Sequence, residues 1–224
     1  QNGTHDDAEP QRTTDAEGAF EFASLTGRTY TLRMIEEGLE QLAPLGNEFT
    51  VIDLPVGDGP QWVSTGDFNH DGFTDLAVAY SDTNSVSVLL NDTAGSFEAP
   101  SETPADGIFP RTMAVADYND DGWEDLYIAS DFGISPLFRN DGDGTFTLVT
   151  LTAEMTEPGT GMGGHAADVD GDGDFDLCQS NFGPNFLWRN DGDGTFTEDG
   201  VNSGIHENVL VNWDCHFYDV DLDG

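Results

Sequence analysis

Short apolar runs recur along most of this chain, and acidic, glycine-rich stretches separate them. Residues 62–66 form a strand-like run that enters one acidic stretch, and the more apolar residues 76–80 leave it. A third run at 85–90 and a short fourth run around Phe97 complete the unit. Runs of four to eight residues bounded by turn residues favour β-strands over helices. The hydrophobic pattern therefore predicts a unit of four short strands.

This unit repeats along the chain. The acidic stretches begin at residues 67, 117, 168 and 219, a spacing of 50 to 51 residues. A repeat of this length predicts a propeller blade or a similar four-strand unit. The later strand-like runs are residues 113–116, 126–130, 137–139 and Phe146 in the second unit, and 164–167, 177–180, 186–189 and Phe196 in the third. The predicted fold class is all-β, a β-propeller of four-stranded blades with about four blades present.

The N-terminal residues do not follow this repeat. We expect residues 1–46 to form a polar segment with a β-hairpin and linker, and residues 47–224 to form the blades. Apolar and polar residues alternate around Phe20 and again around Tyr30, which predicts two short antiparallel strands. Residues 34–45 are expected to form one short helix or a linker.

The acidic stretches have the spacing of calcium loops. In loop three (168–176), carboxylates occupy positions one, three, five and nine, and Gly173 occupies position six. Oxygen ligands two residues apart, with a glycine at the bend, are the chemistry of a calcium loop, and the run lacks the Cys and His that zinc prefers. The loops differ from EF-hands, because position twelve holds Val78, Ile128 or Gln179 in place of Glu.

Each complete loop is expected to bind calcium through the side chains at positions one, three, five and nine and the backbone carbonyl at position seven. Loop one is 67–75 and loop two is 117–125, and the fourth loop is incomplete at Gly224. The predicted ligands are Asp67, Asn69, Asp71, Phe73 and Asp75; Asp117, Asn119, Asp121, Trp123 and Asp125; Asp168, Asp170, Asp172, Asp174 and Asp176; and Asp219, Asp221 and Asp223. Residues 140–144 and 190–194 (Asn-Asp-Gly-Asp-Gly) form either plain hairpin turns or a second cation site.

The charge of the chain limits its partners. The sequence has 44 acidic residues against 6 Lys and Arg, a formal net charge of −38. Such a charge should repel nucleic acid and anionic membranes, and no apolar run approaches the roughly 20 residues needed to insert into a bilayer. Calcium would cancel only a small part of the charge. Either a high-salt habitat, where charges are screened, or a generally acidic secreted protein would account for the rest.

Specific predictions can be made for two cysteines, two histidines and two tryptophans. Cys178 leaves loop three and Cys215 enters the fourth loop, so neighbouring blades would bring them face to face in a disulfide outside the cell. His165 and His216 each lie three residues before a loop, and they either form a ligand site in the propeller channel or simply line it. Trp188 and Trp213 either stack on sugar rings or pack between blades.

The repeats resemble a known family. Loops of the form Asp-x-Asp/Asn-x-Asp-Gly-x-x-Asp-Leu, with Leu-Phe-Arg-Asn-x-Gly-Asp-Gly-Thr-Phe between them, are similar to FG-GAP/VCBS repeats over about residues 47–224. Residues 163–196 look most like the cartilage-acidic-protein and ASPIC/UnbV subgroup. The resemblance implies a calcium-stabilised, integrin-α-like propeller, commonly seven-bladed. Residues 14–33 resemble the closing strands of a carboxypeptidase-regulatory, transthyretin-like domain, or form a hairpin of the repeat array.

These features together predict a binding protein. We expect an extracellular or cell-surface scaffold for adhesion, protein–protein interaction or structural assembly, with three complete calcium sites. Its partner would be a protein or glycan at a cell surface or matrix, and self-assembly is compatible with the pattern. The alternative is a carbohydrate-binding, lectin-like or polysaccharide-cleaving propeller. Catalysis is not expected, because the sequence shows no nucleophile elbow, phosphate loop or catalytic Cys–His spacing.

Overall fold

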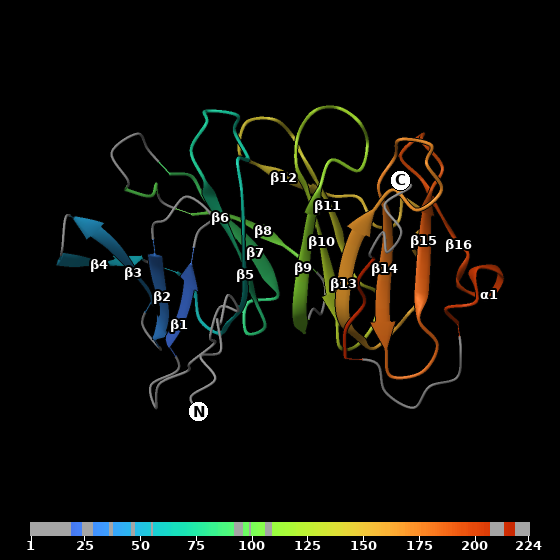
Figure 1. Cartoon of the computed structure of the whole chain (residues 1–224), viewed down its shortest axis with the longest axis horizontal. Coiled ribbons are helices and arrows are strands. Elements are labelled where there is room, and N and C mark those ends of the chain that lie inside the picture. The colour runs from blue at the N-terminus through green and yellow to red at the C-terminus, as the bar shows by residue number, and fades with distance from the viewer. Residues whose placement is uncertain are drawn as a thin grey trace, which may run out of the picture. The chain divides into compact units, whose positions relative to one another are not determined.

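The structure is a computed structural model in which two compact units, Gln1–Asp58 and Gly59–Gly224, are described separately (Figure 1). The described residues are 19–23, 29–35, 38–45, 48–54, 56–91, 96–98, 100–105, 109–206 and 213–217, with backbone alone before Leu54.

The first unit contains one antiparallel sheet in the order β1-β2-β3-β4. Its strands are β1 (Ala19–Ala23), β2 (Thr29–Ile35), β3 (Gly38–Leu45) and β4 (Glu48–Leu54). The expected hairpin is present, with Phe20 opposite Leu32. The sequence-based boundary at 46/47 lies before the division at 58/59, because β4 is paired with β3.

The expected helix or linker at residues 34–45 is wrong. β2 continues to Ile35, and β3 occupies most of the remaining segment. β3 is paired on both sides, with β2 and β4, so ladder hydrogen bonds outweigh the helix-like spacing of its leucines. Pro44 also disfavours a helix interior, because it has no N–H to donate.

The second unit contains three four-stranded sheets in which each strand pairs with the next along the chain. Their strands are β5 (Pro60–Gly66), β6 (Asp75–Tyr80), β7 (Ser85–Leu89) and β8 (Ser101–Pro104); β9 (Pro110–Ala116), β10 (Asp125–Ser130), β11 (Leu137–Asn140) and β12 (Phe146–Leu148); β13 (Gly161–Ala167), β14 (Asp176–Asn181), β15 (Phe186–Asn190) and β16 (Phe196–Glu198), followed by the short helix α1 (Gly200–Ser203). These sheets confirm the all-β, four-stranded blades. The described residues of this unit form consecutive blades and not a closed ring.

The blades pack face to face, with their first strands β5, β9 and β13 side by side (Figure 1). The second strands β6, β10 and β14 are buried along their whole length. One core between the first two blades includes Phe68, Leu126, Ile128 and Phe138. A second core between the next two includes Tyr118, Tyr127, Leu177 and Trp188. Each such side chain contributes roughly 1.5–3 kcal/mol on burial.

The fourth strand of the first blade is displaced from its predicted position. Phe97 forms only an isolated bridge with Asn91, and the regular strand β8 lies further along the chain. Pro100 precedes that strand and cannot donate to the ladder. In the other two blades, the fourth strands begin at Phe146 and Phe196, as predicted.

Residues 213–217 lie beside β13 but are not a strand, although the sequence predicts one. A Cβ added to Gly163 of β13 would lie 2.7 Å from the Cα of Asp214, which shows how closely the two segments approach. No strand in the described part of the chain pairs with this segment, so it lacks the ladder that would define it as a blade. The fourth loop, with Asp219, Asp221 and Asp223, lies outside the described residues.

Candidate metal centre

Loops one, two and three each join the first strand of a blade to its second strand. The glycine at position six has a positive φ in all three, from 86° at Gly72 through 90° at Gly122 to 105° at Gly173. Added Cβ atoms would meet nothing within 4 Å there, so these glycines are required by backbone conformation and not by lack of space. Neighbouring loops also touch, because His70 stacks on Trp123 with ring centroids 4.0 Å apart.

Backbone N–H groups orient the carboxylates at positions one and five. In loop one, Asp67 accepts the N–H of Asp71 at 3.1 Å and that of Gly72 at 3.0 Å. Asp71 in turn accepts the N–H of Phe73 at 2.8 Å. Loop two repeats these bonds through Asp117 and Asp121, and loop three repeats those to positions six and seven through Asp168 and Asp172.

The carboxylate at position nine is buried and joins the loop to the third strand of its blade. Asp125 is 2% exposed and accepts the N–H of Tyr118 at 3.1 Å and that of Asn140 at 2.8 Å. Asp75 and Asp176 make the corresponding pairs of bonds. Because one carboxylate bonds both the loop and the third strand, a change in the conformation of the loop should also affect the packing of the blade.

Burial raises the pKa of all three position-nine carboxyl groups. The pKa of Asp125 rises to about 7, because desolvation outweighs its two backbone hydrogen bonds, and the charges of Asp121 and Asp117 add to the increase. The pKa values of Asp75 and Asp176 are raised for the same main reason. Burial and neighbouring negative charges therefore disfavour the ionised form of these carboxyl groups unless a cation offsets their charge.

Loop three brings three carboxylates close enough to share a metal ion. Asp168, Asp170 and Asp176 each offer an oxygen, and these oxygens lie within 4.8 Å of one another. Among the described residues, this is the only such group of His, Cys, Asp or Glu side chains. Oxygen donors fit a hard cation such as calcium. In loops one and two, position three is Asn69 or Asn119, whose amide carbonyl also offers an oxygen.

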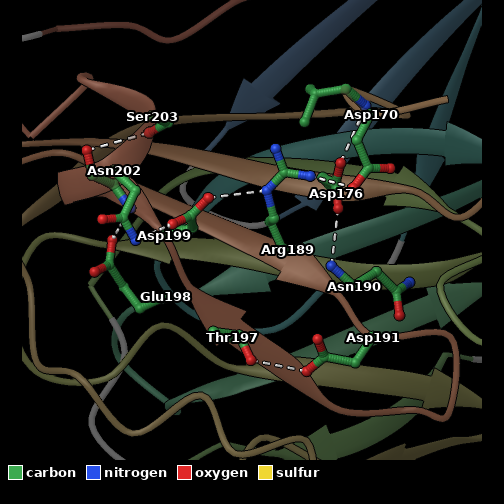
Figure 2. Close-up of polar contacts among 12 residues, drawn as sticks. Asp170, Asp176, Arg189, Asn190, Asp191, Thr197, Glu198, Asp199, Asn202 and Ser203 are labelled. Carbon is green, nitrogen blue, oxygen red and sulfur yellow. Dashed lines mark hydrogen bonds and ion pairs between the residues drawn. The ribbon is translucent and has the colours of Figure 1, made fainter. Parts of the chain in front are cut away.

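An arginine touches loop three, which sequence analysis did not anticipate. Figure 2 shows Arg189 between Asp170 and Asp199, with its Nη1 paired to Asp170 and its Nε 3.0 Å from Asp199. In the second blade, the corresponding Arg139 pairs with Asp141 at 2.8 Å. The recurring Arg-Asn pair at the end of the third strand was the available signal.

The Asn-Asp-Gly-Asp-Gly segments are hairpin turns, and their asparagines connect blades. Asn140 is buried, and its Nδ2 donates to the carbonyl of Phe68 in the preceding blade at 2.9 Å and to that of Glu124 at 3.1 Å. Its Oδ1 accepts the N–H of Gly142. Asn190 repeats all three bonds one blade later.

The acidic residues of the turn at 140–144 have local partners. Asp141 pairs with Arg139 and accepts a bond from Thr147, and these contacts lower its pKa. Asp143 accepts bonds from the hydroxyl and the N–H of Thr145, which lower its pKa too. These contacts favour the plain-turn interpretation over a second cation site.

The predicted disulfide is present. Cys178 on β14 bonds Cys215, with their Cα atoms 6.2 Å apart. It attaches residues 213–217 to the third blade. Within the described part of the chain, no helix is both long and apolar enough to cross a membrane.

The two histidines singled out from the sequence lie next to each other. The rings of His165 and His216 have centroids 5.0 Å apart, and burial together with the second ring lowers the pKa of His165. The Oδ2 of Asp214 lies 2.7 Å from the Nε2 of His216, within hydrogen-bond distance. Trp188 is 3% exposed, which favours packing between blades, whereas Trp213 is 71% exposed.

The fold and loops define a class: repeat proteins whose β-propeller blades carry an aspartate-rich loop between the first two strands. The FG-GAP-like repeat matches residues 67–128 and 117–178, which together make up half of the chain. The chain therefore belongs to the FG-GAP repeat family, as its motifs predict. No curated protein matches it.

Solved structures support the fold. An Agrocybe aegerita lectin that recognises non-reducing terminal N-acetylglucosamine aligns with 81% of this chain at 18% identity and a TM-score of 0.51. BBS1N, solved in complex with ARL6DN, aligns with 85% at 11% identity and a TM-score of 0.50. The chain spans 52% and 57% of these two structures, so it is comparable to about half of each.

Proposed function

We propose that this FG-GAP repeat scaffold binds calcium in its aspartate-rich loops and acts outside the cell by binding a partner, not by catalysis. The observation that carries the proposal is the recurrence of one loop geometry in three consecutive blades. In each, backbone amides orient the carboxylates at positions one and five, and a buried carboxylate occupies position nine. Oxygen-only donors at this spacing suit calcium.

In this proposal, each loop holds its ion through the side chains at positions one, three, five and nine and the carbonyl at position seven. Calcium supplies the positive charge that offsets the mutual repulsion of these carboxylates. The position-nine aspartate also accepts the N–H of the asparagine ending the third strand, as Asp125 does from Asn140. Calcium would therefore stabilise the blade as well as the loop.

An extracellular or cell-surface location is part of the proposal. The disulfide between Cys178 and Cys215 suits an oxidising compartment, and calcium loops of extracellular modules are matched to millimolar calcium. The net charge of −38 disfavours nucleic acid and anionic membranes and suits a high-salt habitat. The proposed partner is a protein or glycan at a cell surface or matrix, or another copy in a structural assembly.

Thermal unfolding with and without a calcium chelator, at fixed ionic strength, tests the calcium proposal. At calcium ten times above the dissociation constant, each site contributes about 1.4 kcal/mol, so three contribute about 4 kcal/mol. That is a large share of a typical stability of about 5–15 kcal/mol. The matched control replaces Asp71, Asp121 and Asp172 by Ala together, which should abolish the response. An unchanged melting temperature in the unaltered protein would contradict the proposal.

A second candidate function is glycan binding, favoured by a cavity in the second unit. The cavity measures about 590 Å³, within the range of small-ligand sites. Its lining residues are Arg111, Asp131, Phe132, Thr160, Met162, Phe182 and Trp213. Phe132, Phe182 and Trp213 are 59%, 52% and 71% exposed, and Arg111 pairs with Asp131 beside them. Aromatic faces next to hydrogen-bonding groups suit a sugar, and the similar lectin recognises one.

A glycan array tests this second function. Trp213→Ala should remove any binding seen with the unaltered chain, because it deletes the most exposed ring of the cavity. Trp62→Ala is the control, since Trp62 is also partly exposed but does not line the cavity. Binding that survives Trp213→Ala would place the sugar elsewhere.

A further inference from the structure

Arg189 is the feature that distinguishes loop three from the other two. It lies on β15, and its guanidinium reaches back to the loop, where Nη1 pairs with Asp170 at position three (Figure 2). On the other side, its Nε lies 3.0 Å from Asp199. The side chains of Arg189 and Asp170 are only 31% and 35% exposed, so solvent screens the pair incompletely.

A comparison with the other two blades shows that the arginine contact occurs together with an acidic residue at position three of the loop. At the same position before the asparagine, the first blade has Leu90 and the second has Arg139, which forms its ion pair with Asp141 and affects Asp121 and Asp125 of its loop only through charge interactions without an ion pair. Position three is Asn69 in loop one and Asn119 in loop two. An arginine therefore contacts the loop in the blade whose position three is acidic.

The formal charges explain this pairing. The four side-chain ligands carry three carboxylates in loops one and two and four in loop three. Counted with these ligand side chains alone, the single positive charge of Arg189, which it shares with Asp199, brings the ligand set of loop three to the net charge of the other two sets. A fixed cation within a few ångströms of a metal ion weakens the binding of that ion, because like charges repel.

We propose that Arg189 is a built-in counter-ion that offsets the fourth carboxylate and sets the calcium affinity of loop three close to that of loops one and two. This inference rests on the proposed calcium function. Arg189 is a positioning and charge-balancing residue here and not a metal ligand. Before calcium binds, the ion pair with Arg189 also offsets the negative charge of Asp170, so the extra carboxylate destabilises loop three less.

Calcium titration followed by ¹⁵N NMR resolves the loops, through the amide signals of the position-six glycines Gly72, Gly122 and Gly173. Arg189→Leu, which introduces the residue of the first blade, should tighten binding at Gly173 about tenfold and leave the other two signals unchanged. Arg189→Gln removes the charge at similar size and should act in the same direction if the Leu variant folds poorly.

Two matched variants control the test. Arg189→Leu combined with Asp170→Asn recreates the pair found in the first blade and should return Gly173 to an affinity close to that of Gly72. Arg139→Leu should change binding at Gly122 less than Arg189→Leu changes binding at Gly173, because Arg139 forms its ion pair with Asp141 and affects Asp121 and Asp125 only through charge interactions without an ion pair. Weaker or unaltered binding at Gly173 in both Arg189 variants would overturn the inference alone. If none of the three glycines responds to calcium in the unaltered protein, the proposed function fails and this inference fails with it.

Discussion

Replacing Asn140 by Ala tests how the blades are held together at their loop end. The side chain of Asn140 makes three hydrogen bonds, to the carbonyls of Phe68 and Glu124 and to the N–H of Gly142. The first of these crosses from one blade to the preceding one. Because Asn140 is 1% exposed, water cannot easily replace its bonds in the variant.

The expected loss of stability follows from this count. A buried hydrogen bond contributes about 0.5–1.5 kcal/mol net, so Asn140→Ala should cost about 3 kcal/mol. Asn91 occupies the same position in the first blade and provides the control. Its Nδ2 donates to the carbonyl of Thr74 at 3.0 Å, and its Oδ1 has no partner among the described residues. Asn91→Ala should therefore cost about 1 kcal/mol.

Urea unfolding of the two variants, at one calcium concentration, measures the difference. The expected result is a free energy of unfolding about 2 kcal/mol lower for Asn140→Ala than for Asn91→Ala. Equal losses would show that the bond to Phe68 does not connect the blades energetically. A loss in Asn140→Ala that disappears at saturating calcium would instead assign the effect to loop two, through Asp125.

Three further perturbations have outcomes that the structure specifies. Replacing Cys178 and Cys215 by Ser should lower stability by roughly 3–4 kcal/mol in urea, because the crosslink joins residues 37 positions apart; an unchanged unfolding midpoint would contradict this. Asp172→Ala should abolish the calcium response of Gly173 in the NMR titration and spare those of Gly72 and Gly122. Tyr127→Phe should cost about 1–2 kcal/mol in urea unfolding, because the buried hydroxyl donates to Gln179 of the next blade; no loss would mean that Gln179 finds another donor.

The fold class and the loops could be predicted from the sequence because their determinants are local. An aspartate, a glycine with positive φ and a second aspartate lie within nine residues, and the backbone bonds that orient Asp67 and Asp71 of loop one join residues at most five positions apart. Repetition at 50 to 51 residues then identified the blade. The disulfide followed from the same repeat, which brings the segment that enters one loop close to the strand that leaves the preceding loop.

Local sequence patterns predicted the wrong element, or the wrong position for it, where pairing between strands determined the structure. The segment 34–45 has helix-like leucine spacing, but β3 is a strand because it bonds β2 and β4 at once. Phe97 has the sequence of a strand start, yet the ladder of the first blade continues only after Pro100.

Only the tertiary structure revealed the contacts that give the loops their individual properties. Asn140 and Asn190 look like ordinary turn residues, but each bonds a carbonyl 72 positions earlier in the chain. Arg189 looks like a repeat residue, but it reaches Asp170, which lies 19 positions before it. The physical reason is that side-chain spacing within a loop depends on a few backbone angles, whereas a contact between blades depends on how whole sheets pack. The residue pattern of a single loop therefore predicts the bonds within that loop, but it does not specify which residues of an adjacent blade the loop contacts.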